Sequence, residues 1–435
     1  MLRISGPRAF AVADAVFRPA GKSSPSPSAA PTHTLLYGHV VRDGVRLDEV
    51  LLAVMRAPRS FTREDVVEIS CHGGVFLTRQ VLSAVLASGA RLAEPGEFTR
   101  RAFLHGRLDL AQAEAVADLI HSRTERAASA AQEQLSGSLS RRVRPMRDDL
   151  LRVLAHVEAH IDFPDEDIAP DTRDALTSRL DGVLNALDEL LATAREGQLL
   201  RRGLRVAIVG RPNAGKSSLL NLLLGHDRAI VSPIPGTTRD TIEETANIRG
   251  LPVIFVDTAG LRQAADDIEA EGIRRTHAAT EAAELVLHVI DRSQPLHETD
   301  LHFLSALASR PRLVVLNKCD QPAAATLPED LPCPEISCRS GSGLELLKDR
   351  IHEIAGFGGA GTGMNQVAIN ARHEDAIRRT RQAAQHAAGE LRADHGLELV
   401  ALELRIAVQA IGEIAGQTAT DDLLDVIFRE FCLGK

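Results

Sequence analysis

Residues 210–218 read GRPNAGKSS, and this stretch decides the fold of the chain around it. An apolar run at 204–209 precedes it and another at 219–224 follows it, so the pattern predicts a strand, a loop and a helix. The spacing G-x-x-x-x-G-K-[ST] puts glycine where the backbone must turn its N–H groups toward a phosphate, because a Cβ would obstruct that approach. We therefore expect a P-loop that binds a nucleoside triphosphate.

The other positions of this loop have expected roles too. Lys216 is expected to reach the β- and γ-phosphates, and Ser217 to offer its hydroxyl to Mg²⁺. The start of the following helix adds the positive end of its dipole to the anion site. A plain glycine turn between a strand and a helix does not explain a lysine and a serine directly after the second glycine. The expected nucleotide contacts in this loop are Asn213, Ala214, Gly215, Lys216, Ser217 and Ser218.

Two later segments have the composition of switches that sense the γ-phosphate. Gly236-Thr237-Thr238 lies in a loop marked by Pro and Gly, and we expect the Thr238 hydroxyl to complete the Mg²⁺ coordination. Asp257-Thr258-Ala259-Gly260 ends an apolar run, which places a carboxylate beside the metal and a flexible glycine at the γ-phosphate. The site is therefore expected to change with the state of the nucleotide.

Two further segments predict which base is bound. Asn317-Lys318-Cys319-Asp320 follows an apolar run, and the Asp320 carboxylate can accept hydrogen bonds from the N1 and N2 donors that guanine has and adenine lacks. Ser337-Cys338 fits the last loop that contacts the base, although this dipeptide alone would be weak evidence. Together the five segments predict GTP as the nucleotide and GTP hydrolysis as the reaction.

One position departs from the pattern of Ras-like proteins, where a glutamine orients the attacking water. Leu261 stands there and can neither donate nor accept a hydrogen bond, so another group must position the water. Glu269 is a candidate, and a solvated acidic loop is the alternative explanation of the stretch 266–271. The side-chain oxygen of Asn213 could bind K⁺, which would supply the positive charge that an arginine finger otherwise brings.

Composition bounds the partners and the compartment. A chain of 435 residues predicts about three domains. The net charge of −9 excludes a protein that grips nucleic acid along its whole length, so any RNA contact must be local. With no Trp and one Tyr, few platforms exist for stacking an unpaired base. Five cysteines without a paired C-x-x-C, and no apolar run long enough for a membrane span, predict a cytoplasmic protein.

The N-terminal region predicts a small α/β domain. Its first thirty residues are poor in acids, as in a transit peptide, but 2–6 alternates like a strand and 10–17 has helical spacing. Strands are expected from 35 to 57, with a turn at Asp43-Gly44, and again at 66–70. Cys71 beside His72 is better explained as a turn than as a nucleophile with its base, because neighbours on a strand point to opposite faces.

Helical patterns flank the nucleotide-binding segments on both sides. They cover 108–163 and 175–200, and they resume at 370–391, 398–414 and 420–431. The acidic residues within 161–170 lack the spacing of a calcium loop, so an acidic turn is expected there. We expect a multidomain α/β plus all-α chain, in which a P-loop GTPase domain with a mostly parallel sheet is inserted into a discontinuous helical domain. The expected segments are an α/β domain at 1–106, a first helical half at 107–202, the GTPase domain at 203–356 and a second helical half at 357–435.

The chain resembles the MnmE (TrmE) family of tRNA uridine modification GTPases over nearly its whole length. The segments that carry the resemblance are LRISG, EISCHGG, PGEFTRRAFLHGRLDLAQAEAVADLI, IDFPDE, GRPNAGKSSLLN, PGTTRD, DTAGLR, NKCD and the terminal FCLGK. The resemblance implies a homodimer with a folate-binding N-terminal domain, joined with an FAD-dependent MnmG-type subunit in a heterotetramer that acts on tRNA. It also implies addition of an aminomethyl or carboxymethylaminomethyl group to C5 of the wobble uridine. The one-carbon unit would come from a 5-formyl- or 5,10-methylene-tetrahydrofolate, and GTP hydrolysis would control the cycle.

The resemblance also assigns residues by position. It implies folate contacts by Arg3, Glu68, Arg107 and Lys435, of which Arg107 stands where the family often has lysine. It implies potassium ligands at Asn213, Ser232, Ile234 and Thr237, and Ile234 can contribute only its carbonyl. Ser232 and Thr237 thereby join the nucleotide site, and Glu269 falls where the family has its catalytic glutamate. Family members usually begin with a further strand and a glycine-rich turn, so we expect either an upstream start or the loss of an edge strand from the folate domain.

Cys432 lies three residues before the final Lys435. A prenylation box fits poorly because glycine and lysine close the chain, and an inert packed thiol is a second alternative. A nearby ammonium would favour the thiolate, so we hypothesise that Cys432 serves the modification chemistry and not GTP hydrolysis. Two other classes of function stay open here, namely a ribosome-assembly switch that binds RNA and a scaffold whose GTPase only times dimerisation. A pure switch requires neither the N-terminal domain nor the terminal cysteine.

Overall fold

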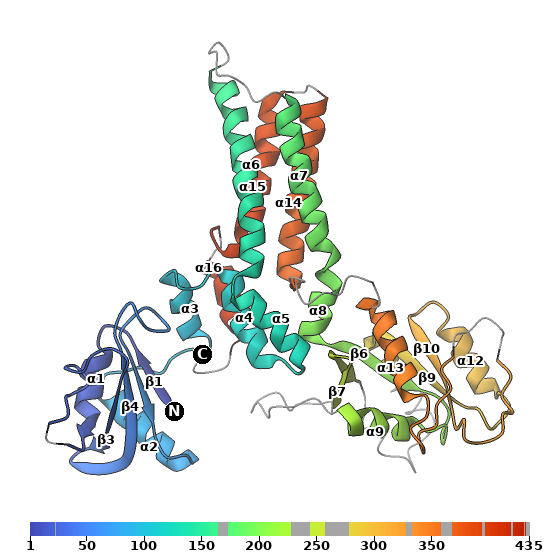
Figure 1. Cartoon of the computed structure of the whole chain (residues 1–435), viewed down its shortest axis with the longest axis horizontal. Coiled ribbons are helices and arrows are strands. Elements are labelled where there is room, and N and C mark those ends of the chain that lie inside the picture. The colour runs from blue at the N-terminus through green and yellow to red at the C-terminus, as the bar shows by residue number, and fades with distance from the viewer. Residues whose placement is uncertain are drawn as a thin grey trace. The chain divides into compact units, whose positions relative to one another are not determined.

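The computed structural model describes residues 1–21, 23–163, 173–227, 244–256, 278–327, 333–357, 368–393, 396–418, 421–429 and 431. The chain forms two compact units. The first comprises Met1–Ala117, Leu135–Leu154 and Leu404–Lys435, and the second comprises Asp118–Gln134 and Ala155–Glu403. Each unit contains one five-stranded sheet, shown with its helices in Figure 1.

An antiparallel sheet with two helices on one face begins the first unit. Its strands are β1 (Leu2–Ser5), β2 (Phe17–Pro19), β3 (Thr34–Arg42), β4 (Val45–Met55) and β5 (Val66–Ser70), in the order β1-β5-β4-β3-β2. Helices α1 (Ala9–Val16) and α2 (Val75–Ala87) cover one face, where inward side chains such as Val40, Leu52 and Ile69 are fully buried. The predicted turn at Asp43-Gly44 is confirmed, and its two positive φ angles of 52° and 78° are those that a two-residue hairpin loop requires.

Two helices of this unit, α2 and α3 (Glu97–Leu104), are not predicted by apolar spacing. In α2 the first two residues, Val75 and Phe76, are 71% and 75% exposed, which blurs the helical period of the buried side chains. Helix α16 (Asp421–Arg429) packs against this region. A Cβ on Gly96 would lie 2.6 Å from the carbonyl oxygen of Phe428, so only glycine permits this approach.

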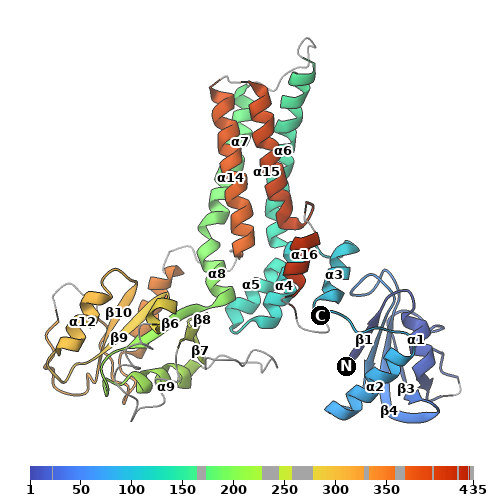
Figure 2. The same cartoon turned by 180° about the vertical axis from the view of Figure 1, so that it is seen from behind.

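The predicted helical segments on both sides of the nucleotide-binding region are confirmed. The first set comprises α4 (Leu110–His121), α5 (Glu125–Leu135), α6 (Ser138–Asp162), α7 (Arg173–Ala192) and α8 (Ala194–Arg202), and the second comprises α14 (Ala371–Arg392), α15 (Leu397–Ala415) and α16. Figures 1 and 2 show α7 and α14 side by side, and the ion pairs Asp188–Arg381 and Asp181–Arg392 join them. No helix among the described residues is long and apolar enough to cross a membrane.

The second sheet is mostly parallel, as predicted for a P-loop domain. Its strands are β6 (Leu204–Val209), β7 (Glu244–Ile248), β8 (Leu251–Phe255), β9 (Leu285–Asp291) and β10 (Arg312–Asn317), in the order β10-β9-β6-β8-β7. Among the described strands of this sheet, only the β7–β8 pair is antiparallel. Among the described residues, the helices of this region are α9 (Lys216–Asp227), α12 (Glu298–Ala306), α13 (Leu344–His352) and the short π-helix η1 (Glu353–Phe357).

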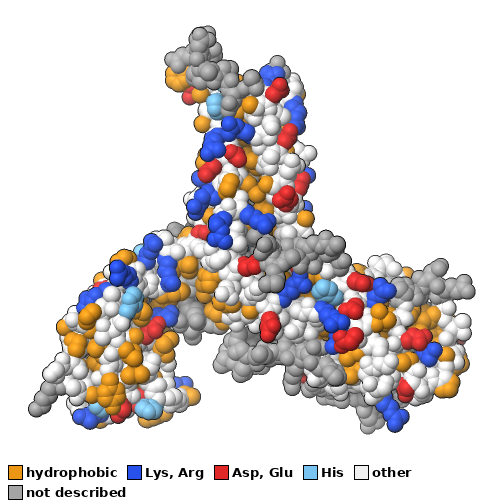
Figure 3. Space-filling model, viewed as in Figure 1, with side chains coloured by type: hydrophobic (Ala, Val, Ile, Leu, Met, Phe, Trp, Pro, Cys, Tyr) orange, Lys and Arg blue, Asp and Glu red, His pale blue; other side chains and the backbone are white. Residues whose placement is uncertain are grey.

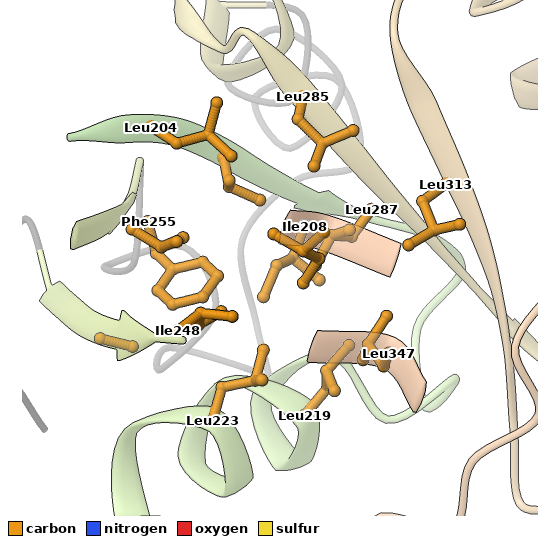
Figure 4. Packing of buried hydrophobic residues seen from close by; sticks show 14 of the residues in the cluster. Leu204, Ile208, Leu219, Leu223, Ile248, Phe255, Leu285, Leu287, Leu313 and Leu347 are labelled. Carbon is orange, nitrogen blue, oxygen red and sulfur yellow. The ribbon is translucent and has the colours of Figure 1, made fainter. Parts of the chain in front are cut away.

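Helices cover both faces of this parallel sheet. On one face, side chains of the strands meet Leu219 and Leu223 of α9 and Leu347 of α13, as Figure 4 shows. On the other face, Leu304 of α12 packs on Ile290 and Val314 of the strands. Because both faces are covered, β9 is a continuous run of buried residues without polar alternation.

The chain enters and leaves this nucleotide-binding region beside one helix. Gly203 ends α8 directly before β6, and the returning chain reaches Ile369 just before α14. A Cβ on Gly197 in α8 would lie 2.7 Å from the backbone nitrogen of Ile369, so the two passages touch. This contact agrees with an inserted domain, while the four predicted segment boundaries stay predictions.

Candidate functional site

The loop between β6 and α9 has the backbone shape that its glycines predict. Gly210 has φ +144°, and a Cβ there would lie 2.2 Å from the carbonyl oxygen of Val289 at the end of the neighbouring strand β9. Gly215 has φ +100°, and its Cβ would lie 2.0 Å from Nδ2 of Asn317. Asn213 lies between them at a φ of 62°, in the left-handed region. The loop therefore packs so closely on Val289 and Asn317 that a side chain at either glycine would collide with them.

Lys216 closes this loop from its C-terminal end. Its Nζ donates hydrogen bonds to the carbonyl oxygens of Gly210 at 2.8 Å and Arg211 at 2.9 Å, and burial lowers the pKa of the amine. Ala214 is buried, Ser217 is partly buried at the start of α9, and Asn213 and Ser218 are exposed. The predicted loop residues therefore come together around a helix start, where a phosphate is stabilised by N–H groups and by the helix dipole.

Asn317 joins the loop to the segments predicted to contact the base. Its side chain is at the end of β10 and only 2% of the residue is exposed. Nδ2 donates to the carbonyl oxygen of Ala214 at 2.8 Å, and Oδ1 accepts from the backbone nitrogen of Cys338 at 3.2 Å. One buried amide thus fixes three predicted segments relative to one another.

The remaining base-contacting residues are held by short polar contacts. Lys318, at a φ of 66°, donates from Nζ to Oδ2 of Asp291 at 2.6 Å. Burial alone would raise the pKa of Asp291, but hydrogen bonds from Lys318 and Ser293 outweigh it and lower that pKa. A hydrogen bond from Ser337 is the main cause that lowers the pKa of the exposed Asp320, so this carboxylate stays ionised and available as an acceptor. Asp291, which orients Lys318, was not predicted, although it ends an apolar run as Asp257 does.

The Cys338 side chain is a neutral thiol at this site. Burial raises the pKa of its thiol to about 11, so the side chain stays protonated at neutral pH. In this structure Cys338 contributes to the loop through its backbone nitrogen, which donates to Oδ1 of Asn317. The neighbouring Ser337 is 1% exposed and organises the loop, because its hydroxyl accepts from the backbone nitrogen of Ser340 at 3.2 Å.

Several predicted site residues lie outside the described residues, and their roles stay predictions. These are Ser232, Ile234, Thr237, Thr238, Asp257, Thr258, Ala259, Gly260, Glu269, Cys432 and Lys435. Of the two predicted Mg²⁺ ligands, Ser217 is described and Thr238 is not. Within the described ranges, no group of three or more His, Cys, Asp or Glu side chains is arranged to hold a metal ion.

The hairpin β7–β8 connects the two predicted switch segments, since β7 begins after the first and β8 ends before the second. Its turn and its first strand are bonded to the chain between α4 and α5. Thr124 Oγ1 donates to the carbonyl oxygen of Gly250 at 2.8 Å, and Arg123 Nη1 donates to Oγ1 of Thr245 at 2.9 Å. Thr245 is 2% exposed, so this contact is shielded from water.

A second cluster of predicted residues lies on the N-terminal sheet. Arg3 and Glu68 face each other on the paired strands β1 and β5, and Arg3 Nε donates to Oε1 of Glu68 at 2.6 Å. The Arg3 guanidinium lies 5.4 Å from the ring centroid of Phe61 and 5.5 Å from that of Phe98. Arg107 lies 4.7 Å from the Phe61 ring and donates to the Phe61 carbonyl oxygen at 2.8 Å. Arg3 and Arg107, two of the predicted folate contacts, therefore lie against the same phenylalanine ring, and Arg3 is paired with the third, Glu68.

This cluster concentrates positive charge. Burial lowers the pKa of Arg107, and the neighbouring charges of Arg63 and Arg3 lower it further. The two aromatic rings, Phe61 and Phe98, were missed by sequence reasoning. A signal for them existed, because aromatic residues make up only 3% of the chain and these two stand within two or three residues of Arg63, Arg100 and Arg101. The cluster offers a planar apolar surface, one carboxylate and several cations.

A strand–loop–helix cradle, bridged by a buried asparagine to an Asn-Lys-x-Asp loop and a Ser-Cys loop, defines a P-loop protein of the GTPase class. The family model described as the N-terminus of GTP-binding protein TrmE matches residues 1–107, and the MnmE helical domain matches 110–432. The tRNA modification GTPase MnmE of Geobacter sulfurreducens is 48% identical over 441 residues, which cover 100% of this chain and 96% of the relative. The protein of that name from Chloroflexus aurantiacus is 47% identical over 444 residues, with the same coverage.

Among solved structures, the G domain of the T. maritima FeoB iron transporter is 27% identical over 35% of this chain and 98% of its own, with a TM-score of 0.27. The full-length matches, in contrast, extend over every segment of the chain, including both helical halves. The chain belongs to the MnmE family of tRNA modification GTPases. The family and the fold class predicted from the sequence are thereby confirmed.

Proposed function

We propose that this protein hydrolyses GTP at the P-loop site and that the hydrolysis cycle controls modification of C5 of the wobble uridine in tRNA. The observation that carries the GTPase half is the Asn317 bridge, because it fixes the phosphate loop and both base loops as one site. The tRNA half is supported by membership in the family and by the names of full-length relatives. In this proposal the protein acts in tRNA modification and is not a switch GTPase without modification chemistry.

The residues of the P-loop site divide the work of binding and hydrolysis. Lys216 would contact the phosphates, and Asp320 would read the N1 and N2 donors of guanine. Ser217 and Thr238 would hold Mg²⁺, which neutralises charge on the phosphates when it is bound. The close packing of the loop supports this assignment, because a Cβ at either glycine would collide with Val289 or Asn317. The attacking water would be positioned by Glu269, since Leu261 offers no hydrogen bond.

We extend the proposal to K⁺ at the tip of the loop. Asn213 is exposed there with a left-handed backbone, so its side-chain oxygen can face a cation next to the phosphates. Ser232, Ile234 and Thr237 would complete the set of ligands. A monovalent cation at this place supplies positive charge where negative charge develops during hydrolysis.

The N-terminal cluster is the proposed binding site of a tetrahydrofolate derivative. A reduced pteridine presents a flat ring with N–H donors, and its tail carries carboxylates. The ring of Phe61 offers a surface for stacking, Glu68 offers acceptors for the donors, and Arg3 and Arg107 offer cations for the acidic tail. Tetrahydrofolate supplies the one-carbon unit when bound, while these side chains orient it.

The end of the chain is proposed to act at the same cluster. Phe431 is 5% exposed, and its ring lies 5.4 Å from that of Phe428. Both pack beside Gly96 at the start of α3, and Phe98 of α3 contacts Arg3. The anchored Phe431 directly precedes Cys432, which supports a role for this thiol in the modification chemistry. In a reaction reconstituted with the flavin-containing partner and tRNA, Cys432→Ser should keep GTP hydrolysis and lose the modified nucleoside. Full modification by this variant would refute the role.

The outer face of the N-terminal sheet is the proposed homodimer surface. Leu35 and Tyr37 of β3 and Leu51 of β4 are 60%, 51% and 43% exposed on the face opposite α1 and α2. Figure 3 shows hydrophobic side chains gathered on this domain. Apolar patches of this kind mark protein contacts. The FAD-dependent MnmG-type subunit is proposed from family membership alone.

Mass spectrometry of tRNA nucleosides from cells that lack the protein tests the proposed function. We expect the modified wobble uridine to disappear and to return with the wild-type gene, but not with Lys216→Ala. An unchanged set of wobble uridines in the deletion strain would reject the tRNA half of the proposal. The GTPase half would still be decided by hydrolysis assays on the purified protein.

A further inference from the structure

The second residue of the P-loop is tied to a helix on the other face of the sheet. Arg211 Nε lies 2.8 Å from Oδ2 of Asp300, and the two side chains are 20% and 1% exposed. Asp300 belongs to the first turn of α12, which packs against β9 and β10. A charged pair in which one partner is almost wholly buried is costly to break, because the remaining charge has no solvent.

Asp300 also has a local structural role that must be separated from this tie. Its Oδ2 accepts from the backbone nitrogen of His297 at 3.1 Å, which completes a capping box at the start of α12. Its second oxygen, Oδ1, is buried and has no hydrogen-bond partner among the described residues. The ion pair with Arg211 is thus the main compensation for the buried negative charge.

Two contacts restrain residue 211 in this structure. Lys216 holds its backbone carbonyl oxygen at 2.9 Å, and Asp300 holds its side chain. A P-loop lysine directs its ammonium to the phosphates of a bound nucleotide, so the first contact competes with the ligand. The second contact joins the Arg211 side chain to α12 and does not involve Lys216, so it can persist when Lys216 turns to the phosphates.

The loop has an uncommon backbone shape that a restraint helps to keep. Asn213 has a positive φ of 62°, which is uncommon for a residue with a side chain, and it lies between Gly210 and Gly215, which adopt positive φ without strain. Gly210 is held by its fit against Val289, and Gly215 by its fit against Asn317. Arg211 lies between these supports and is anchored by Asp300.

We propose that Asp300 is a positioning residue for GTP binding, which acts through Arg211 to hold the P-loop in its binding shape after Lys216 has turned to the phosphates. This proposal rests on GTP binding at the P-loop. It predicts that the ion pair contributes to the affinity for GTP and for GDP alike, because both ligands use the same cradle. It predicts a small effect on the rate at saturating GTP, because neither side chain touches the reacting atoms.

The test measures equilibrium binding and dissociation of fluorescent mant-GTP and mant-GDP with the full chain. Asp300→Asn removes the charge but keeps an acceptor for His297, and Arg211→Ala removes the other partner. We expect about tenfold weaker binding of both ligands in either variant, with kcat within about twofold of wild type, from the usual contribution of charge-assisted hydrogen bonds. The double variant should be no weaker than either single variant. Arg211→Lys should recover part of the loss, since an ammonium keeps the charge.

A matched control is Glu298→Gln, which removes an exposed carboxylate from the same first turn of α12 and should leave both affinities unchanged. Wild-type affinity in Asp300→Asn and Arg211→Ala would overturn the proposal and leave Asp300 as a helix cap only. Tighter binding in Asp300→Asn would also overturn it, because Asp300 would then be keeping Arg211 away from the phosphates. If Asp300→Asn does not fold, Arg211→Lys decides, since it keeps the charge beside Asp300 and changes only the geometry of the pair, and it should then bind both ligands more weakly than wild type. Failure of wild-type protein to bind mant-GTP would reject the proposed function itself.

Discussion

Replacing Asn317 by aspartate tests whether one buried amide holds the GTP site together. The variant keeps the size of the side chain and an oxygen for the backbone nitrogen of Cys338. It replaces the Nδ2 donor by an oxygen that faces the carbonyl oxygen of Ala214, where the wild-type hydrogen bond measures 2.8 Å. Because the residue is 2% exposed, water cannot take the place of the lost donor.

The magnitude follows from the burial of this contact. A buried acceptor that loses its donor costs about 1–3 kcal/mol, so we take about 2 kcal/mol for the loss of the joined arrangement. If this whole loss falls on the nucleotide-bound state, the apparent Kd for both GTP and GDP rises about thirtyfold, since each 1.4 kcal/mol is a factor of about ten. Preference for guanine over xanthine should not change, because Asp320 and not Asn317 faces the base.

Fluorescence titration with mant-GDP and mant-GTP measures this effect, with thermal unfolding of the same samples as a check on folding. Cys319→Ser is the matched control, since it alters a side chain two residues further along the same loop and should bind normally. A Kd for Asn317→Asp within twofold of wild type would refute the reasoning, because the P-loop and the base loops would then be positioned independently.

Three further predictions concern other described or expected groups. Asp320→Asn should weaken GTP binding and favour xanthosine triphosphate, because one of the two acceptors of the side chain becomes a donor. Competition titrations with both nucleotides measure the base preference, and an unchanged preference would contradict the role of Asp320. GTP hydrolysis should be faster in K⁺ than in Na⁺ at equal ionic strength, and equal rates would count against Asn213 as an ion ligand. Burial lowers the pKa of His288 to about 4, with Asp300 opposing this effect, so the folded protein keeps the imidazole neutral. The unfolded chain takes up the proton first, near pH 6.5, so this contribution to stability is complete above that pH and falls by about 1.4 kcal/mol per unit toward pH 4. Hydrogen exchange at histidine C2, followed by mass spectrometry, should give a midpoint well below 6, and a midpoint near 6.5 would contradict the burial argument.

The parts of the structure that depend on local pattern could be predicted from the sequence. The cradle of residues 210–218 follows from glycine spacing, and the hairpin turn at Asp43-Gly44 follows from a two-residue loop with positive φ angles. The long helices follow from apolar spacing, because their buried stripes repeat with the helical period. In each case the information lies within a few residues of the feature.

The contacts that depend on tertiary structure could not be predicted in this way. The meeting of Arg211 with Asp300, and of Asn317 with Ala214, joins residues roughly ninety to a hundred positions apart, and no local pattern encodes either pair. The rings around Arg3 come from a loop and from α3, a helix that apolar spacing did not reveal. Family resemblance supplied Arg3, Glu68 and Arg107, but it did not supply the aromatic residues that bring them together.

The two hydrogen bonds between residues 123–124 and the hairpin β7–β8 have a thermodynamic consequence. The hairpin lies in the chain between both switch segments, so a movement of either segment that shifts the hairpin must carry these bonds or break them. Coupling between two sites is reciprocal. If nucleotide binding changes the free energy of this contact, then a change in the contact alters the free energy of nucleotide binding by the same amount. A macromolecule that bound the chain between α4 and α5 and altered these bonds would therefore change GTP affinity without touching the nucleotide.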